Sequence, residues 1–69
     1  MSTTTTITVT GMTCDHCVRA VRDEVSAIQG VTNVEVDLAS GQVTIEAATE
    51  LDPAAVAAAV DEAGYEVAP

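Results

Sequence analysis

The sequence predicts a small α+β fold, an antiparallel sheet with two helices on one face, and three observations lead to it. Three segments alternate apolar and polar residues, and two segments repeat apolar residues every three or four positions. Glycine or proline separates most of these segments, and a short tail follows the last one. The resulting order of strand, helix, strand, strand, helix, strand is the ferredoxin-like βαββαβ sandwich, with four antiparallel strands.

The first strand is expected from Thr4 to Thr10. Ile7 and Val9 can face the core while the threonines beside them face solvent, which is the period of two of a half-buried strand. Gly11 interrupts the alternation, so the strand is expected to end before it.

The first helix is expected from Asp15 to Gln29. Valine and isoleucine residues recur there at steps of three and four, which places them on one side of a helix. This stripe consists of Val18, Val21, Val25 and Ile28. Gly30 follows at the position where a glycine often caps a helix.

A hairpin is expected next, with its turn at Ser40 and Gly41. The apolar positions of its two strands alternate with acidic residues and threonine. These apolar positions are Val34, Val36 and Leu38 in one strand and Val43, Ile45 and Ala47 in the other.

The second helix has a clear start signal, because Asp52 can cap it and Pro53 suits the first helical position. Gly64 is expected to end it. Its inward stripe would consist of Val56, Ala59, Val60 and Ala63. The tail from Tyr65 to Ala68 is long enough for one short closing strand.

Length and charge limit the function classes. A chain of 69 residues is expected to form one domain, residues 1–69. Its net charge of -9 would repel nucleic acid and anionic membranes, so neither is an expected partner. No apolar run is long enough for a signal-peptide core or a membrane span, so we expect a cytoplasmic protein without membrane insertion.

The stretch from Gly11 to Cys17 holds both cysteines and the only histidine. With Cys14 in a loop and Cys17 in the first helical turn, the spacing of three residues puts both sulfurs on one side of the chain. Unpaired N–H groups at a helix start favour the thiolate and lower its pKa. Thiolates are soft ligands, which suits Cu(I), zinc or iron–sulfur clusters.

Other interpretations of the two cysteines remain open at this point. Two cysteines separated by two residues at a helix start are also a motif of thiol–disulfide oxidoreductases. The chain lacks the tryptophan or the Gly-Pro pair that would accompany that motif, and neither of its prolines looks like a cis-proline facing the dithiol. Free cysteines also pack well as small apolar residues, which would give them no chemical role.

The run Gly11-Met12-Thr13-Cys14-Asp15-His16-Cys17, together with Gly64-Tyr65 before the last strand, resembles the heavy-metal-associated (HMA) domain family. Within it the chain looks most like the small bacterial copper chaperones. The resemblance implies a non-enzymatic cytosolic carrier whose metal ligands are Cys14 and Cys17 and whose cargo is Cu(I). It also implies transfer by ligand exchange to the metal-binding domain of a copper-exporting P-type ATPase.

The resemblance also singles out three residues around the metal ligands. Met12 matches a methionine that usually packs under the loop, and Tyr65 matches a tyrosine found near the site in bacterial members. His16 lies between the two ligands, where tuning of the thiolates is expected more than permanent ligation.

Two further questions concern the metal and the oligomeric state. Carriers of mercury, cadmium or zinc are alternatives within the family, although zinc prefers four ligands. We expect a monomer without metal. Because thiolates can bridge Cu(I), a copper-bridged homodimer is the form to look for at excess copper.

Overall fold

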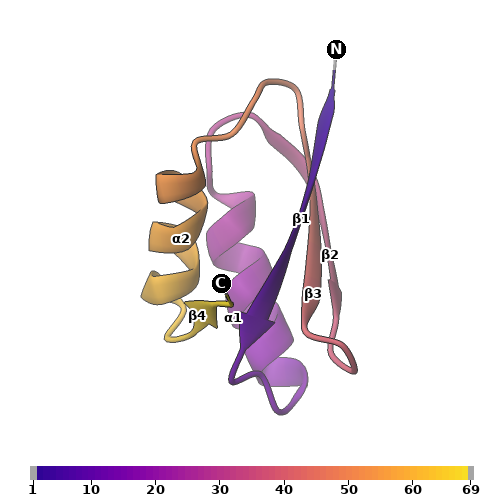
Figure 1. Ribbon diagram of the computed structural model, residues 1–69, viewed down its shortest axis with the longest axis vertical. Coiled ribbons are helices and arrows are strands. Elements are labelled where there is room, and N and C mark those ends of the chain that lie inside the picture. Colours follow the sequence, from indigo (N-terminus) through magenta and orange to yellow (C-terminus); the bar gives the residue numbers. More distant parts are fainter. Residues whose placement is uncertain (1, 69) are drawn as a thin grey trace.

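The computed structural model describes residues 2–68, and it confirms the expected fold. Its elements are β1 (Thr3–Thr10), α1 (Asp15–Ser26), β2 (Val31–Asp37), β3 (Gln42–Ala47), α2 (Pro53–Glu62) and β4 (Glu66–Val67). Both helices cover the same face of the sheet (Figure 1). Neither helix of this part of the chain combines the length and apolar character needed to cross a membrane.

The four strands form one antiparallel sheet in the order β2-β3-β1-β4. β1 pairs with β3 over six positions, from Thr3 opposite Ala47 to Thr8 opposite Gln42. β4 pairs with only two residues of β1, Val9 and Thr10. Most of β1 therefore has β3 on one side and no strand of residues 2–68 on the other.

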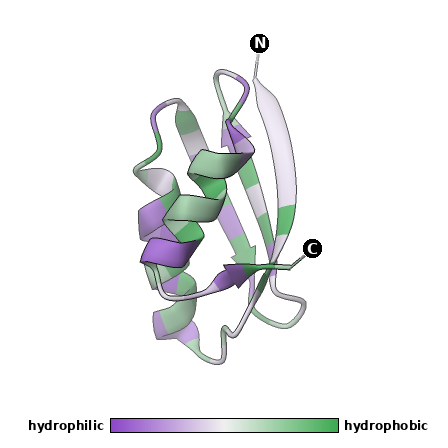
Figure 2. Cartoon of the chain, turned by 60° about the vertical axis from the view of Figure 1, so that its left-hand side comes forward, coloured by the Kyte–Doolittle hydropathy of each residue, from purple (hydrophilic) through white to green (hydrophobic). Residues whose placement is uncertain are grey.

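The core lies between the sheet and the helices and is built of aliphatic side chains. Its largest fully buried members are Ile45, Val21, Val25, Val43 and Val60. Figure 2 shows apolar segments in the strands and in both helices. Each such side chain contributes roughly 1.5–3 kcal/mol by leaving water. Among residues 2–68 no polar or charged side chain is buried, so burial of aliphatic surface is the main stabilising term.

The first helix is shorter than the spacing of its apolar residues predicted. It ends at Ser26, whereas the prediction extended it to Gln29. The N–H groups of Ala27 and Ile28 donate to carbonyls three residues back, at 3.3 and 3.1 Å, which tightens the chain into a turn. Ile28 still packs against the core from this turn. β2 consequently starts at Val31, before Val34, which was the first apolar position expected in this strand.

The predicted hairpin is present, but Leu38 lies in its turn and not in β2. Asp37 starts the turn with two hydrogen bonds. Its side chain accepts from the N–H of Ala39 at 3.1 Å, and its carbonyl accepts from the N–H of Gly41 at 2.8 Å. These bonds end the strand one residue before the alternating pattern does.

The second helix has the predicted caps. The Asp52 side chain accepts from the N–H of Ala54 at 2.9 Å, and Pro53 is the first helical residue. At the other end the N–H of Tyr65 donates to the carbonyl of Val60 at 3.1 Å, and Gly64 donates to Asp61 at 2.9 Å. These two bonds form a Schellman motif, which turns the chain toward β4.

Candidate metal centre

The two cysteines lie where the loop after β1 enters α1, at the end of the molecule opposite the amino terminus (Figure 1). Cys14 is the N-cap of α1, with extended backbone angles of -157° and 174°. Its carbonyl accepts from the N–H of Cys17 at 3.1 Å and of Val18 at 3.3 Å. The first helical turn therefore sets the position of Cys17 relative to Cys14.

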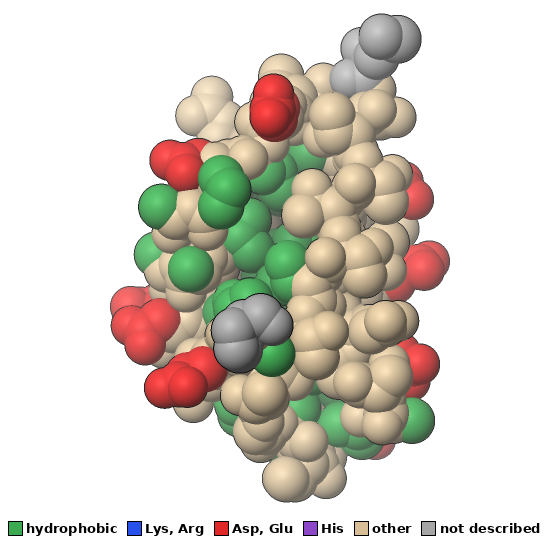
Figure 3. All heavy atoms as spheres, viewed as in Figure 1, with side chains coloured by type: hydrophobic (Ala, Val, Ile, Leu, Met, Phe, Trp, Pro, Cys, Tyr) green, Lys and Arg blue, Asp and Glu red, His purple; other side chains and the backbone are tan. Residues whose placement is uncertain are grey.

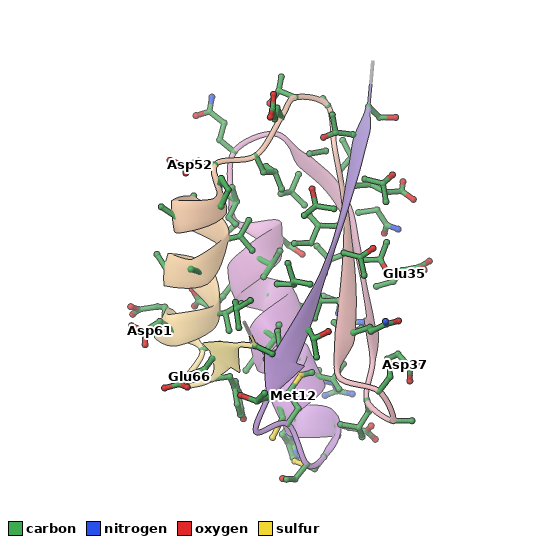
Figure 4. The ribbon with its side chains drawn as sticks, viewed as in Figure 1. Met12, Glu35, Asp37, Asp52, Asp61 and Glu66 are labelled. Atoms are coloured by element: carbon green, nitrogen blue, oxygen red, sulfur yellow. The ribbon has the colours of Figure 1, made fainter. Side chains whose placement is uncertain are left out.

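The two sulfur atoms are close but differ in exposure. The Sγ atoms of Cys14 and Cys17 are 3.4 Å apart, so the expected placement on one side of the chain is confirmed. Cys14 is exposed, whereas Cys17 is only 9% exposed. Figure 4 shows the sulfur atoms gathered at this end of the molecule, beside Met12. One ion can contact both sulfurs from the solvent side.

The surroundings of Cys17 favour its thiolate. A hydrogen bond from the Thr13 backbone, then one from the Tyr65 hydroxyl and one from the Cys14 thiol, lower the pKa of Cys17 from 9.0 to about 6, against the opposing effect of burial. At neutral pH Cys17 is therefore mostly ionised. The pKa of Tyr65 is raised, because its hydroxyl donates to Cys17 and lies close to two sulfurs that can carry negative charge.

Tyr65 reaches the site from the other end of the sequence. The Schellman motif at the end of α2 directs it toward the loop, and its ring lies against the backbone of Gly11. Gly11 has a φ of +92°, and a Cβ atom at this position would be 3.3 Å from Cδ1 of the ring. The sequence showed Gly11 only as a strand terminator, and no local signal indicates that it also accommodates the ring.

Met12 and His16 occupy different surroundings. Met12 is half-buried and packs against the core, whereas His16 is exposed in the first turn of α1. Within residues 2–68 no three side chains of His, Cys, Asp or Glu lie close enough together to hold an ion. The structure thus brings together Cys14, Cys17 and Tyr65, while Met12 packs against the core. Within residues 2–68 no His, Asp or Glu side chain completes a three-ligand cluster with the two sulfurs.

Small ferredoxin-like domains that present two thiols at the start of the first helix form one class of protein, and this chain has both features. The model of the heavy-metal-associated domain matches residues 6–66. The chain therefore belongs to the heavy-metal-associated domain family.

Similar proteins include both free-standing chains and parts of transporters. The chain is 39% identical to the copper chaperone CopZ of Bacillus subtilis, over 91% of this chain and 93% of CopZ. It is 40% identical to the copper-transporting ATPase 2 of Rhizobium meliloti, over 83% of this chain but only 7% of the ATPase. A solved CopZ metallochaperone superposes with a TM-score of 0.89 at 31% identity, covering 96% of this chain and all of that one.

Proposed function

We propose that this chain is a non-enzymatic Cu(I) carrier that acts as one domain, residues 1–69, in the cytoplasm. It holds one Cu(I) between the thiolates of Cys14 and Cys17. The observation that carries the proposal is the pair of sulfurs 3.4 Å apart, which in the described chain belongs to no cluster of three His, Cys, Asp or Glu side chains. A two-sulfur site suits soft, low-coordinate Cu(I), whereas zinc is usually held by four ligands.

The unequal exposure of the two sulfurs supports release by ligand exchange. An incoming thiolate can reach the metal from the side of the exposed Cys14. Its sulfur forms a bond to Cu(I) to give a three-coordinate intermediate, and the Cys14–copper bond then breaks. A second thiolate of the recipient next binds the ion, and the bond to the less exposed Cys17 breaks last. The ion remains bound to at least two sulfurs throughout, and its oxidation state does not change.

The proposed recipient is the metal-binding domain of a copper-transporting P-type ATPase. The similarity between most of this chain and a small part of the Rhizobium meliloti ATPase supports this proposal, because donor and recipient would then present similar sites. Transfer between two similar dithiols needs little driving force in either direction. Nucleic acid and membrane lipid are not proposed as partners.

Three neighbours of the ligands are proposed to tune the site without binding the metal. Tyr65 stabilises the Cys17 thiolate by its hydrogen bond. Met12 supports the loop from the core side, and the exposed imidazole of His16 lies between the two ligands in the first turn of α1. Without metal the protein is proposed to be monomeric. Excess copper would give a Cu(I)-bridged homodimer, which sedimentation at rising copper ratios tests; an unchanging monomer would contradict it.

The first experiment is an anaerobic titration of the reduced protein with Cu(I) against a chromophoric Cu(I) chelator, with zinc as competitor. We expect one Cu(I) per chain and no displacement by zinc. Cys14→Ser and Cys17→Ser should each weaken binding by more than about a thousandfold, or about 4 kcal/mol. Thr44→Ser, on the outer face of the sheet, is the control and should bind like the wild type.

Two results of this titration would overturn the copper assignment. Tight binding retained by either serine variant would show that the two sulfurs are not both ligands. Displacement of Cu(I) by zinc, or by cadmium or mercury in the same competition titration, would favour a carrier of another metal ion.

Thiol–disulfide oxidoreduction is the second candidate, and one observation favours it. A thiol with a pKa of about 6 lies 3.4 Å from an exposed thiol, an arrangement that also suits disulfide exchange. A disulfide-reductase assay with a thiol donor distinguishes the two functions. Catalytic turnover would favour the oxidoreductase, and a Cu(I) carrier should show none.

A further inference from the structure

The amino-terminal half of β1 presents an open strand edge. The N–H of Ala68 donates to the carbonyl of Thr8 at 2.7 Å, and β4 continues from there only toward Thr10. The N–H of Val9 instead points to the β3 side of the strand, where it donates to the carbonyl of Gly41. Because backbone groups alternate in direction along a strand, those of Thr4 and Thr6 point to the same side as those of Thr8. Within residues 2–68 no strand pairs with them there.

An apolar groove of about 320 Å³ lies beside this open edge, between β1 and α2. Its walls are mostly aliphatic, and Val56 at its base belongs to the core. The groove is lined by Thr5, Ile7, Glu50, Leu51, Pro53, Val56, Ala57 and Val67. Figure 3 shows apolar side chains reaching the surface between α2 and β1. An unpaired edge beside an apolar groove is the combination that binds an extended peptide as an added strand.

The charges around the groove are all negative. Glu50 lines it, and Asp52, Asp61 and Glu66 lie along the side of the molecule formed by α2 and the start of β4 (Figure 4). The only two cations of the chain are arginines 19 and 22, and both are on α1. Figure 3 shows acidic and no basic side chains on this face. A segment that carries lysine or arginine is therefore complementary to the groove.

We propose that the open edge of β1 and the adjoining groove bind an extended segment of a partner protein, with aliphatic residues at alternate positions and basic residues beside them. Its backbone would pair with Thr4 and Thr6 as an additional antiparallel or parallel strand. Every second side chain would then point to the helix side and enter the groove, while the basic residues lie near Glu50. This surface is separate from the dithiol and is not part of the function proposed above.

The edge itself lacks the features that usually prevent strand addition. Residues 3–8 are threonines and one isoleucine, with no charge and no proline, and β-branched residues favour extended structure. A second copy of this chain is a poor occupant, because each copy carries a net charge of -9. Repulsion between two such copies opposes edge-to-edge pairing, whereas a basic segment is attracted.

The groove is far enough from the dithiol for both to be occupied. Along β1 the groove residues Thr5 and Ile7 precede Thr10 by five and three residues of extended strand, which corresponds to about 16 and 10 Å. The dithiol loop begins only after Thr10. A segment in the groove would therefore leave the sulfurs accessible, and it could hold a partner nearby while the metal is exchanged.

The test uses a synthetic peptide of alternating valine and threonine with a lysine at each end, acetylated and amidated. It is titrated into the reduced, metal-free protein and followed by amide NMR spectra. We expect shifts at Thr5, Ile7 and Ala57, and slower amide exchange at Thr4 and Thr6. Ala57→Arg should weaken binding by at least about tenfold, because it narrows the groove and repels lysine.

Matched controls separate groove binding from general attraction. Ala58→Arg adds the same charge one residue later on α2, at an exposed position that does not line the groove, and should bind like the wild type. Thr6→Pro removes an N–H on the open edge and should weaken binding. The same peptide with glutamate in place of lysine should bind at least about tenfold more weakly.

Several outcomes would overturn the proposal. They are the absence of shifts at millimolar peptide, shifts confined to the dithiol loop, and equal losses in Ala57→Arg and Ala58→Arg. Protection of the Thr4 and Thr6 amides that rises with protein concentration alone would identify a second copy as the occupant. None of these results depends on copper, so failure here leaves the proposed function untouched.

Discussion

The core and the dithiol loop differ in composition and in what holds them in place. The core consists of aliphatic side chains, such as Ile45 and Val21, that are fully removed from water. The loop is mostly exposed, and only Cys17 within residues 11–17 is buried. Nonpolar burial stabilises the core, whereas hydrogen bonds and one aromatic contact organise the loop. Changes in the core should therefore alter folding, and changes in the loop should alter the thiols.

Ile45→Ala should have the largest effect on folding. It removes a fully buried side chain from the central part of the sheet, and such changes cost about 2–5 kcal/mol. Urea unfolding of the metal-free protein measures this loss. Glu46→Ala, at the next and exposed position of β3, is the control and should cost much less. Equal losses would mean that burial does not distinguish these positions.

Gly11→Ala should affect both folding and the thiols. Its φ of +92° strains an alanine by about 1–2 kcal/mol, and the new Cβ would press on the Tyr65 ring at 3.3 Å. Displacement of the ring weakens the hydrogen bond to Cys17 and should raise the pKa of that thiol. Thiolate absorbance against pH measures the shift.

Gly30→Ala is the matched control for Gly11→Ala, because Gly30 follows the end of α1 that is remote from the cysteines. Its φ is +94°, and a Cβ at this position would be 2.9 Å from Oγ1 of Thr49, a side chain that does not touch the thiols. It should lose similar stability and leave the pKa of Cys17 near 6. If both variants raise the pKa equally, the contact between Gly11 and Tyr65 is not what positions the hydroxyl.

Tyr65→Phe tests the hydroxyl alone, with the ring retained. The pKa of Cys17 should rise above 6, because one of the hydrogen bonds that favour its thiolate is lost. Stability should change by no more than about 1 kcal/mol. A titration midpoint unchanged from the wild type would show that the hydroxyl does not stabilise the thiolate.

The pH dependence of folding should reflect the ionisation of Cys17. The pKa of Cys17 is lower in the folded chain than its ordinary value of 9.0, so the folded state binds fewer protons between pH 6 and 9. The resulting stabilisation is fully present above pH 9 and is lost as the pH falls through 6. Wild-type stability relative to Cys17→Ser should therefore increase from pH 6 to 9, and parallel curves would contradict this.

Most of the fold was predictable because its signals are local. The apolar alternation of β1, the caps at Asp52 and Gly64, and the order of the elements each depend on residues a few positions apart. The end of α1 was predicted too late because Ile28 is apolar and contacts the core whether it belongs to a helix or to a turn. The spacing of apolar residues indicates which side chains contact the core, and Ile28 still contacts the core after the helix has ended.

The βαββαβ order and the pair of cysteines at a helix start could be predicted without a structure, since both follow from spacing along the chain. The folded arrangement was needed to show which sulfur is exposed, which is buried, and how Tyr65 contacts both Gly11 and Cys17. It also decided that β4 covers two residues of β1 and leaves an open edge beside a groove. The contacts of Tyr65 and of β4 join residues about fifty positions apart along the chain, and short-range propensities carry no information about them.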